Sequence, residues 1–325
     1  MEENLFEQRT DLDDLRQAVE QLKREIGKVI VGQEAMVELL LAGILADGHM
    51  LIEGVPGVAK TLTAKLLSRV ISVGFSRIQF TPDLMPSDVI GTSVFNPGDN
   101  NFQFKHGPIF SNIVLIDEIN RAPAKTQSAL FEVMEERQIT VDGVTYHLQP
   151  PFMVVATQNP IEQEGTYHLP EAQLDRFLFK IRVVYPTQEE EFHIVSNHHL
   201  MKGNQRIDTV DPVISGARIQ ELRDKVRGLH IEEKLIQFIT AIVVATRNHK
   251  AIYLGASPRA SIGILNGAKA LAAMRGRDFV TPEDIVYITP AVLRHRLVLT
   301  PEREMEGTTT DEVIEEIVKS IEVPR

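Results

Sequence analysis

A short loop at residues 54–61 combines two glycines with a lysine and a threonine. It reads Gly54-Val55-Pro56-Gly57-Val58-Ala59-Lys60-Thr61 and matches the phosphate-binding loop except at Ala59, which replaces a glycine. Backbone N–H groups of such a loop, with the positive end of the next helix, can surround a diphosphate. Lys60 would contact the β- and γ-phosphates, and the Thr61 hydroxyl would ligate Mg²⁺. The alternative is a glycine-rich turn that happens to end in Lys-Thr. The apolar segment before the loop and the helical stretch from Leu62 favour nucleotide binding.

Two acids follow a second apolar segment. Residues 113–116 are Ile-Val-Leu-Ile, and Asp117 and Glu118 come directly after them. In an open α/β sheet this position is the carboxyl edge, where ligands bind. Asp117 would hold the Mg²⁺ shell, and Glu118 could deprotonate the attacking water. The pair could instead cap the next helix. A binding-only switch does not need the second acid, so the pair favours hydrolysis.

Asn159 and Arg121 are further polar candidates near these acids. Asn159 follows the apolar segment 153–156, where an amide can reach between Glu118 and the γ-phosphate. The alternative for Asn159 is that Asn-Pro simply starts a turn. Arg121 either touches a neighbouring subunit or pairs with an acid of its own chain.

Two arginines lie outside these segments. Arg176 stands between Asp175 and the last predicted strand, where it is poorly placed for its own nucleotide but could enter a neighbour's site in a ring. Alternatively it forms a surface pair with Asp175. Arg259 follows Ser257 and Pro258, a favourable N-cap and first helical residue. A cation there opposes the helix dipole, so either a γ-phosphate compensates its charge or the side chain is simply exposed.

Composition limits the class of protein. The chain has 325 residues, 43% hydrophobic and 24% charged, which suits about two packed domains and not a disordered chain. No apolar run approaches the ~18 residues of a membrane helix, the N-terminus is acidic, and there is no cysteine. We therefore expect a soluble, cytoplasmic protein.

With 34 basic and 45 acidic residues the net charge is −11, which makes nucleic acid an unlikely partner.

The elements that must position these residues alternate between strand and helix. Helical periodicity from Thr10 to Ile30 includes a possible Thr10–Asp13 capping box. The predicted strands are 50–52, 78–80, 113–116, 153–156 and 179–183. Alternation with helices implies a mainly parallel sheet, and the two most apolar segments, 113–116 and 153–156, should be its central strands.

Two insertions interrupt this alternation. Residues 94–104 and 138–148 each place turn residues between β-prone ones, and each predicts a hairpin. After Pro186 the pattern is helical, without a convincing strand. We therefore predict an α/β nucleotide-binding domain at 1–186 and a smaller all-helical domain at 187–325.

Taken together, the ordered motifs resemble the AAA+ ATPases, and more closely the MoxR family. The resemblance runs from about residue 29 to 299. It identifies 54–61 as Walker A, 113–118 as Walker B, Asn159 as sensor 1, 169–177 as the arginine-finger segment with Arg176, 257–259 as sensor 2 with Arg259, and Val31-Gly32-Gln33-Glu34 as the segment bordering the adenine.

The resemblance also implies a fold and a function. The fold would be a three-layer P-loop domain with strand order 5-1-4-3-2 and a helical lid, with the hairpins as the helix-2 insertion and the pre-sensor hairpin. The function would be Mg²⁺-dependent ATP hydrolysis by a ring, expected to be hexameric, that remodels or activates a protein partner. In MoxR relatives that partner often bears a von Willebrand factor A domain.

Other functions stay open at this point. Within the same branch, the chain could be the motor subunit of a metal-chelatase complex. It could also be a nucleotide-dependent binding switch with little turnover. A GTPase is disfavoured because no Asn-Lys-x-Asp sequence occurs, and nucleic-acid translocation is disfavoured by charge. In the leading hypothesis, Lys60 and Arg259 hold the same phosphates from opposite sides, so that hydrolysis moves the lid.

Overall fold

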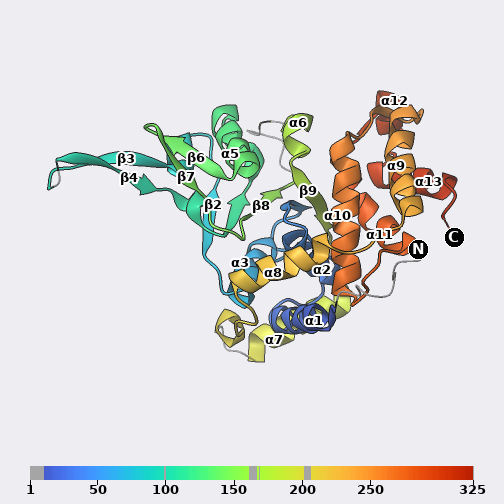
Figure 1. Ribbon diagram of the computed structural model, residues 1–325, viewed down its shortest axis with the longest axis horizontal. Helices are drawn as coiled ribbons and strands as arrows, with labels where there is room; N and C mark the ends of the chain where they lie inside the picture. Colours follow the sequence, from blue (N-terminus) through green and yellow to red (C-terminus); the bar gives the residue numbers. More distant parts are fainter. Residues whose placement is uncertain (1–10, 99, 161–166, 168, 201–205, 325) are drawn as a thin grey trace, which may run out of the picture.

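A five-stranded parallel sheet forms the centre of the molecule (Figure 1). The computed structural model describes residues 11–98, 100–160, 167, 169–200 and 206–324. The strands are β1 (His49–Gly54), β2 (Phe75–Gln79), β5 (Ile113–Asp117), β8 (Met153–Gln158) and β9 (Phe177–Val183), in the order β2-β5-β8-β1-β9. When the five sheet strands are numbered along the chain and read from β9 to β2, this is the order 5-1-4-3-2. The predicted α/β fold is therefore confirmed.

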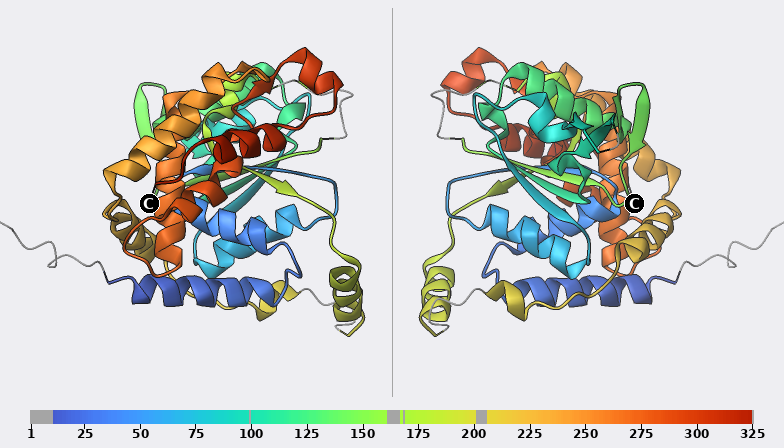
Figure 2. Two further views of the ribbon diagram at one scale, coloured as in Figure 1. Left: turned by 90° about the vertical axis from the view of Figure 1, so that its right-hand side faces the viewer. Right: turned by 90° about the vertical axis from the view of Figure 1, so that its left-hand side faces the viewer.

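Alternate residues of the strands face two separate hydrophobic cores. Met50 and Ile52 of β1 point to the core shared with helices α1 (Asp13–Gly27), α2 (Glu34–Leu45) and α3 (Lys60–Val70). Leu51 points to the opposite core, shared with α5 (Ala124–Glu136). Because β5 and β8 are buried on both faces, they read as unbroken apolar runs, as predicted. Figure 2 shows helices above and below the sheet.

Helix α1 lies outermost beneath the sheet (Figure 2). It buries a stripe of apolar side chains, as its periodicity predicts: Leu15, Val19, Leu22 and Ile26. The helix begins at Asp13, with Leu12 as a cap residue that makes no side-chain hydrogen bond. Thr10, the proposed partner of Asp13 in a capping box, lies outside the described residues.

Both predicted hairpins are present. The first consists of β3 (Gly91–Asn96) and β4 (Asn101–His106), and it extends away from the body of the molecule (Figure 1). The second consists of β6 (Gln138–Val141) and β7 (Val144–His147). The rings of Phe104 and Tyr146 lie 4.7 Å apart, so aromatic packing joins the two hairpins. The shorter segments of this half are α4 (Pro86–Ile90), η1 (Pro108–Phe110), η2 (Ile119–Arg121) and α6 (Glu171–Leu174).

The second half of the chain is mostly helical. Its helices are α7 (Gln188–Leu200), η3 (Arg206–Thr209), α8 (Gly216–Arg227), α9 (Glu233–Asn248), α10 (Pro258–Met274), α11 (Pro282–Leu293), α12 (Pro301–Met305) and α13 (Thr310–Ser320). The expectation that no strand follows Pro186 was wrong. Strands β10 (Ile252–Leu254) and β11 (Val298–Leu299) form an antiparallel ribbon. Segments of three and two residues are too short to show a period of two in the sequence.

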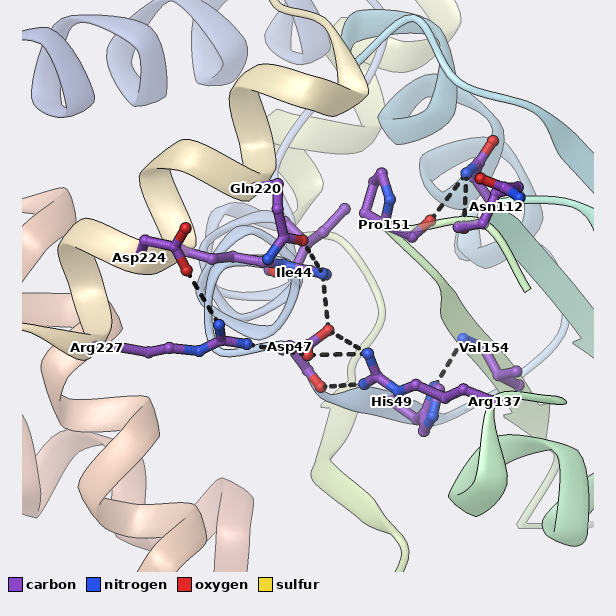
Figure 3. Close-up of polar contacts among 12 residues, drawn as sticks. Ile44, Asp47, His49, Asn112, Arg137, Pro151, Val154, Gln220, Asp224 and Arg227 are labelled. Atoms are coloured by element: carbon purple, nitrogen blue, oxygen red, sulfur yellow. Dashed lines mark hydrogen bonds and ion pairs between the residues drawn. The ribbon is translucent and has the colours of Figure 1, made fainter. Parts of the chain in front are cut away.

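Helix α8 packs against the α/β layers before the chain reaches α9. Buried Arg223 of α8 donates from Nε to the carbonyl oxygen of Ile44 at 2.7 Å and pairs with Asp47 at 2.7 Å. Figure 3 shows Asp47 among arginines, with Arg137 and Arg227 also directed at its carboxylate. Helix α8 follows Pro186 in the sequence but contacts the α/β layers. The boundary at Pro186 between the two predicted domains therefore stays a proposal. No helix in the described ranges has the length and apolarity needed to span a membrane.

Candidate nucleotide site

The loop between β1 and α3 has the conformation that its glycines allow. Gly57 adopts a φ of +87°, which favours a residue without a Cβ atom. A Cβ on Gly54 would come within 2.8 Å of the carbonyl oxygen of Val183 on the adjacent strand. Ala59 has a φ of +62° as the cap residue of α3, so the residue that departs from the motif also adopts a left-handed conformation.

Lys60 and Thr61 open helix α3. The Lys60 ammonium donates to the carbonyl oxygen of Gly54, which folds the side chain back over the loop. Lys60 and Thr61 both line the cleft beside this loop. Positive charge and N–H groups thus meet at a helix N-terminus, an arrangement that favours a phosphate group.

The acids at the end of β5 are held by neighbouring strands. Arg77 donates from Nε to Oδ2 of Asp117 at 2.6 Å, and the Thr157 hydroxyl donates to Oδ1 at 3.1 Å. Glu118 has a φ of +57°, and its Oε2 accepts from Gln79 Nε2 at 2.9 Å. These contacts fix both carboxylates at the carboxyl edge of the sheet.

Arg121 pairs with Glu118 of its own chain, with 3.0 Å between Arg121 Nε and Glu118 Oε2. The sequence left this choice open between a neighbour and an acid of the same chain. The contact places a guanidinium beside the carboxylate proposed to activate water.

A cleft of about 400 Å³ joins these groups. Of the residues predicted from the sequence, it is lined by Pro56, Gly57, Ala59, Lys60, Thr61, Leu62, Asp117, Glu118 and Asn159. Gly54, Val55 and Val58 belong to the loop but do not line the cleft. The cleft therefore brings together groups from the ends of β1, β5 and β8, as the topology of a parallel sheet requires.

The oxygen donors in the cleft suit Mg²⁺. The Thr61 hydroxyl and the Asp117 carboxylate are hard oxygen ligands, which Mg²⁺ prefers, often with several waters retained. Each Asp117 oxygen already accepts one hydrogen bond and has a second lone pair for a water of the metal shell. When bound, the ion would neutralise charge on the phosphate oxygens.

Three residues of the cleft were not predicted: Arg77, Gln79 and Thr157. Arg77 and Gln79 lie two residues apart on β2 and therefore share a face of the sheet. The segment Phe75-Ser76-Arg77-Ile78-Gln79 does not alternate between apolar and polar residues, so it gave no clear signal. Only the strand order places Arg77 and Gln79 beside Asp117.

Val31 and Gly32, expected to border the adenine, do not line this cleft. Gly32 lines a separate cavity of about 650 Å³, with Glu38 of α2 and Tyr287 of α11. The Tyr287 hydroxyl donates to Oε2 of Glu38 at 2.7 Å. Burial and this bond raise the pKa of Tyr287 above its ordinary value.

The two predicted arginines lie at the opposite edge of the sheet. Arg176 precedes Phe177, which pairs with His49 at the start of β1, whereas the loop follows Gly54 at its end. Five residue steps of ~3.3 Å separate these edges by about 16 Å.

Arg259 forms an ion pair with Glu135, as Arg176 does. The expectation that Arg259 and Lys60 hold the same phosphates of one subunit is therefore wrong for this structure. The register of β9 and the docking of α10 place Arg259 at the other edge.

Comparisons with known proteins agree with this architecture. The protein family described as "ATPase family associated with various cellular activities (AAA)" matches residues 49–179, and the family "AAA lid domain" matches residues 244–317. A solved structure described as a "putative ATPase" from Cytophaga hutchinsonii is 43% identical, with a TM-score of 0.89 and 97% of each chain covered.

Two curated relatives match nearly the whole chain. "Uncharacterized protein YeaC" of Bacillus subtilis (strain 168) is 46% identical over 312 residues, covering 96% of this chain and 97% of that protein. "Chaperone MoxR1" of Mycobacterium tuberculosis (strain H37Rv) is 44% identical over 314 residues, covering 93% of this chain and 81% of that protein. The chain therefore belongs to the MoxR family of AAA+ ATPases.

Proposed function

We propose that the protein hydrolyses ATP with Mg²⁺ in the cleft between β1, β5 and β8. The observation that carries this proposal is the convergence of Lys60, Thr61, Asp117, Glu118 and Asn159 on one cleft. Lys60 binds the β- and γ-phosphates, and Thr61 and Asp117 hold the metal shell. Glu118 takes a proton from the attacking water, and Asn159 orients the water or the γ-phosphate.

We further propose that the site is completed by a neighbouring subunit in a ring, expected to be a hexamer. Arg176 and Arg259 lie at the edge of the sheet opposite the cleft, so they are poorly placed for the nucleotide of their own chain. In a head-to-tail ring, this edge of one subunit faces the cleft of the next. Arginines supplied in this way can increase hydrolysis by ~10³–10⁵.

The experiment is a subunit mixture. Glu118→Gln chains keep both arginines but lack the base, and Arg176→Ala chains keep the base but lack one arginine. Each chain alone is expected to be nearly inactive, and their mixture should regain turnover at interfaces that combine the intact halves. The specific activity of the wild type should also rise with protein concentration. A mixture no more active than its components, or a flat concentration profile for a monomer, contradicts the shared site.

The work performed by hydrolysis is proposed to be the remodelling or activation of a protein partner. The name of the relative "Chaperone MoxR1" supports a chaperone-like role. The resemblance to the MoxR family suggests a partner that bears a von Willebrand factor A domain. Stimulation of the ATPase by a purified domain of this type would support the proposal. No stimulation and no binding at micromolar concentrations would count against this class of partner.

A further inference from the structure

Glu135, near the end of α5, contacts arginines from two different parts of the chain. Its Oε2 lies 3.3 Å from Arg176 Nη1, and its Oε1 lies 2.7 Å from Arg259 Nη2. Arg176 follows α6 in the α/β domain, and Arg259 is the second residue of the lid helix α10. One carboxylate thus uses one oxygen for each guanidinium.

The surroundings show why a shared acid is needed there. A cavity of about 270 Å³ at this edge is lined by four arginines and three acids: Arg137, Arg176, Arg259, Arg296, Asp47, Glu135 and Asp175. Cations outnumber anions in this cavity, although the whole chain has a net charge of −11. Without Glu135, the guanidiniums of Arg176 and Arg259 would repel each other and would have no common acceptor.

Further hydrogen bonds join the lid to Asp175 and Phe177, the two neighbours of Arg176 in the sequence. Ser257, directly before α10, donates to Oδ2 of Asp175 at 3.0 Å. Buried Arg296 donates to Oδ1 of Asp175 at 2.6 Å and also to the carbonyl oxygen of Phe177 at 2.7 Å. Helices α6 and α10 are accordingly neighbours in Figure 1. The two arginines therefore belong to a lid and an α/β domain that meet at this edge.

We propose that Glu135 is a positioning residue that sets Arg176 and Arg259 side by side, so that they reach a neighbour's phosphates as one unit. This inference rests on the proposed function, in which both arginines act on the next subunit. Each pair with Glu135 is partly exposed, and such pairs have a small net energy. A phosphate can therefore replace the carboxylate at low cost, while the geometry of the two guanidiniums is prepared in advance.

The test uses the subunit mixture with one added change. Donor chains carry Glu118→Gln, and acceptor chains carry Arg176→Ala and Arg259→Ala, so turnover occurs only where donor arginines meet an acceptor cleft. Adding Glu135→Gln to the donor should lower kcat by about 3- to 10-fold. KM for ATP should stay unchanged because the cleft of the acceptor is intact. Glu135→Asp on the donor should retain more activity than Glu135→Gln.

A matched control is Glu132→Gln on the donor, an equal charge change at an exposed position of the same helix, which should leave kcat unchanged. An unchanged kcat with Glu135→Gln on the donor would overturn the inference. So would an equal loss when Glu135→Gln is placed only on the acceptor, because that result indicates a general structural role. If the mixture without any change at Glu135 is inactive, the shared site itself fails, and the inference fails with it.

Discussion

The Nε atom of Arg77 lies 2.6 Å from Oδ2 of Asp117, so the acid proposed to hold the Mg²⁺ shell already forms an ion pair with a guanidinium. The side chain of Asp117 is 9% exposed and that of Arg77 is 55% exposed, and both residues line the cleft. A cation beside a metal-binding carboxylate lowers the electrostatic attraction between that carboxylate and a second cation. Arg77 is therefore expected to tune the concentration of Mg²⁺ that the protein needs.

Replacing Arg77 by alanine should lower the Mg²⁺ concentration for half-maximal ATPase activity, by about threefold to tenfold, because one competing charge is removed. The measurement is a Mg²⁺ titration at saturating ATP. Arg77→Lys, which keeps the charge, serves as the control and should stay close to the wild type. A higher requirement for Mg²⁺ in the alanine variant would show that Arg77 supports the site in another way.

Glu118→Gln should reduce turnover by at least ~10² while ATP still binds, because an amide cannot accept the proton of water. The neighbours of Glu118 are hydrogen-bond donors, Gln79 Nε2 and Arg121 Nε, and the amide oxygen can still accept from them. Turnover is measured by phosphate release, and binding by calorimetry with Mg²⁺-ATP. Near-normal turnover would remove Glu118 from the role of base.

Ala59→Gly should raise the free energy of unfolding by up to about 1 kcal/mol, because it relieves a left-handed φ of +62°. The added freedom of glycine in the unfolded chain opposes this gain, so a larger effect is not expected. Ala59→Val should instead destabilise, since a β-branched residue fits this conformation poorly. Urea unfolding of the three proteins decides the matter, and a clear loss of stability in the glycine variant would contradict the prediction.

Asp47→Asn should lower the free energy of unfolding by about 3–5 kcal/mol. The change leaves Arg223, whose side chain is 1% exposed, without its counter-charge. Burial already lowers the pKa of Arg223 to about 10, so the guanidinium depends on this acid. The control is Asp224→Asn, which removes an exposed pair with Arg227 and should change stability by less than about 1 kcal/mol. Similar losses in both variants would show that the burial of Arg223 is not the cause.

The free energy of unfolding should fall as the pH drops below 6.5, the ordinary pKa of histidine. Burial lowers the pKa of His49 from 6.5 to about 4, and its Nδ1 accepts from the backbone N–H of Val154. The unfolded chain therefore binds a proton between pH 6.5 and 4 that the folded chain excludes, and stability is lost across that window. Burial also lowers the pKa of His295, which adds to the loss.

The test is urea unfolding at pH 7.5 and at pH 5. His49→Gln should show a smaller difference between the two pH values than the wild type, although it is less stable at pH 7.5. An unchanged pH dependence in that variant would assign the effect to other groups.

Much of the architecture follows from the sequence. Unbroken apolar runs at 113–116 and 153–156 predict strands that are buried on both faces, and both are central in the sheet. The loop from Gly54 to Thr61 predicts a phosphate site because its residues are adjacent in the chain. Local patterns such as these depend on neighbouring residues and on the period of a strand or helix, and the sequence contains both.

The placement of distant groups was decided only by tertiary structure. The pairing of Arg77 with Asp117 depends on β2 lying beside β5, and 40 residues separate the two side chains. The meeting of Arg176 and Arg259 at Glu135 depends on how α10 docks on the sheet edge. Such contacts arise from the packing of apolar faces, whose relative register and direction no local pattern encodes. For this reason the sequence predicted which residues could act on a phosphate, and the fold decided which edge of the sheet each of them occupies.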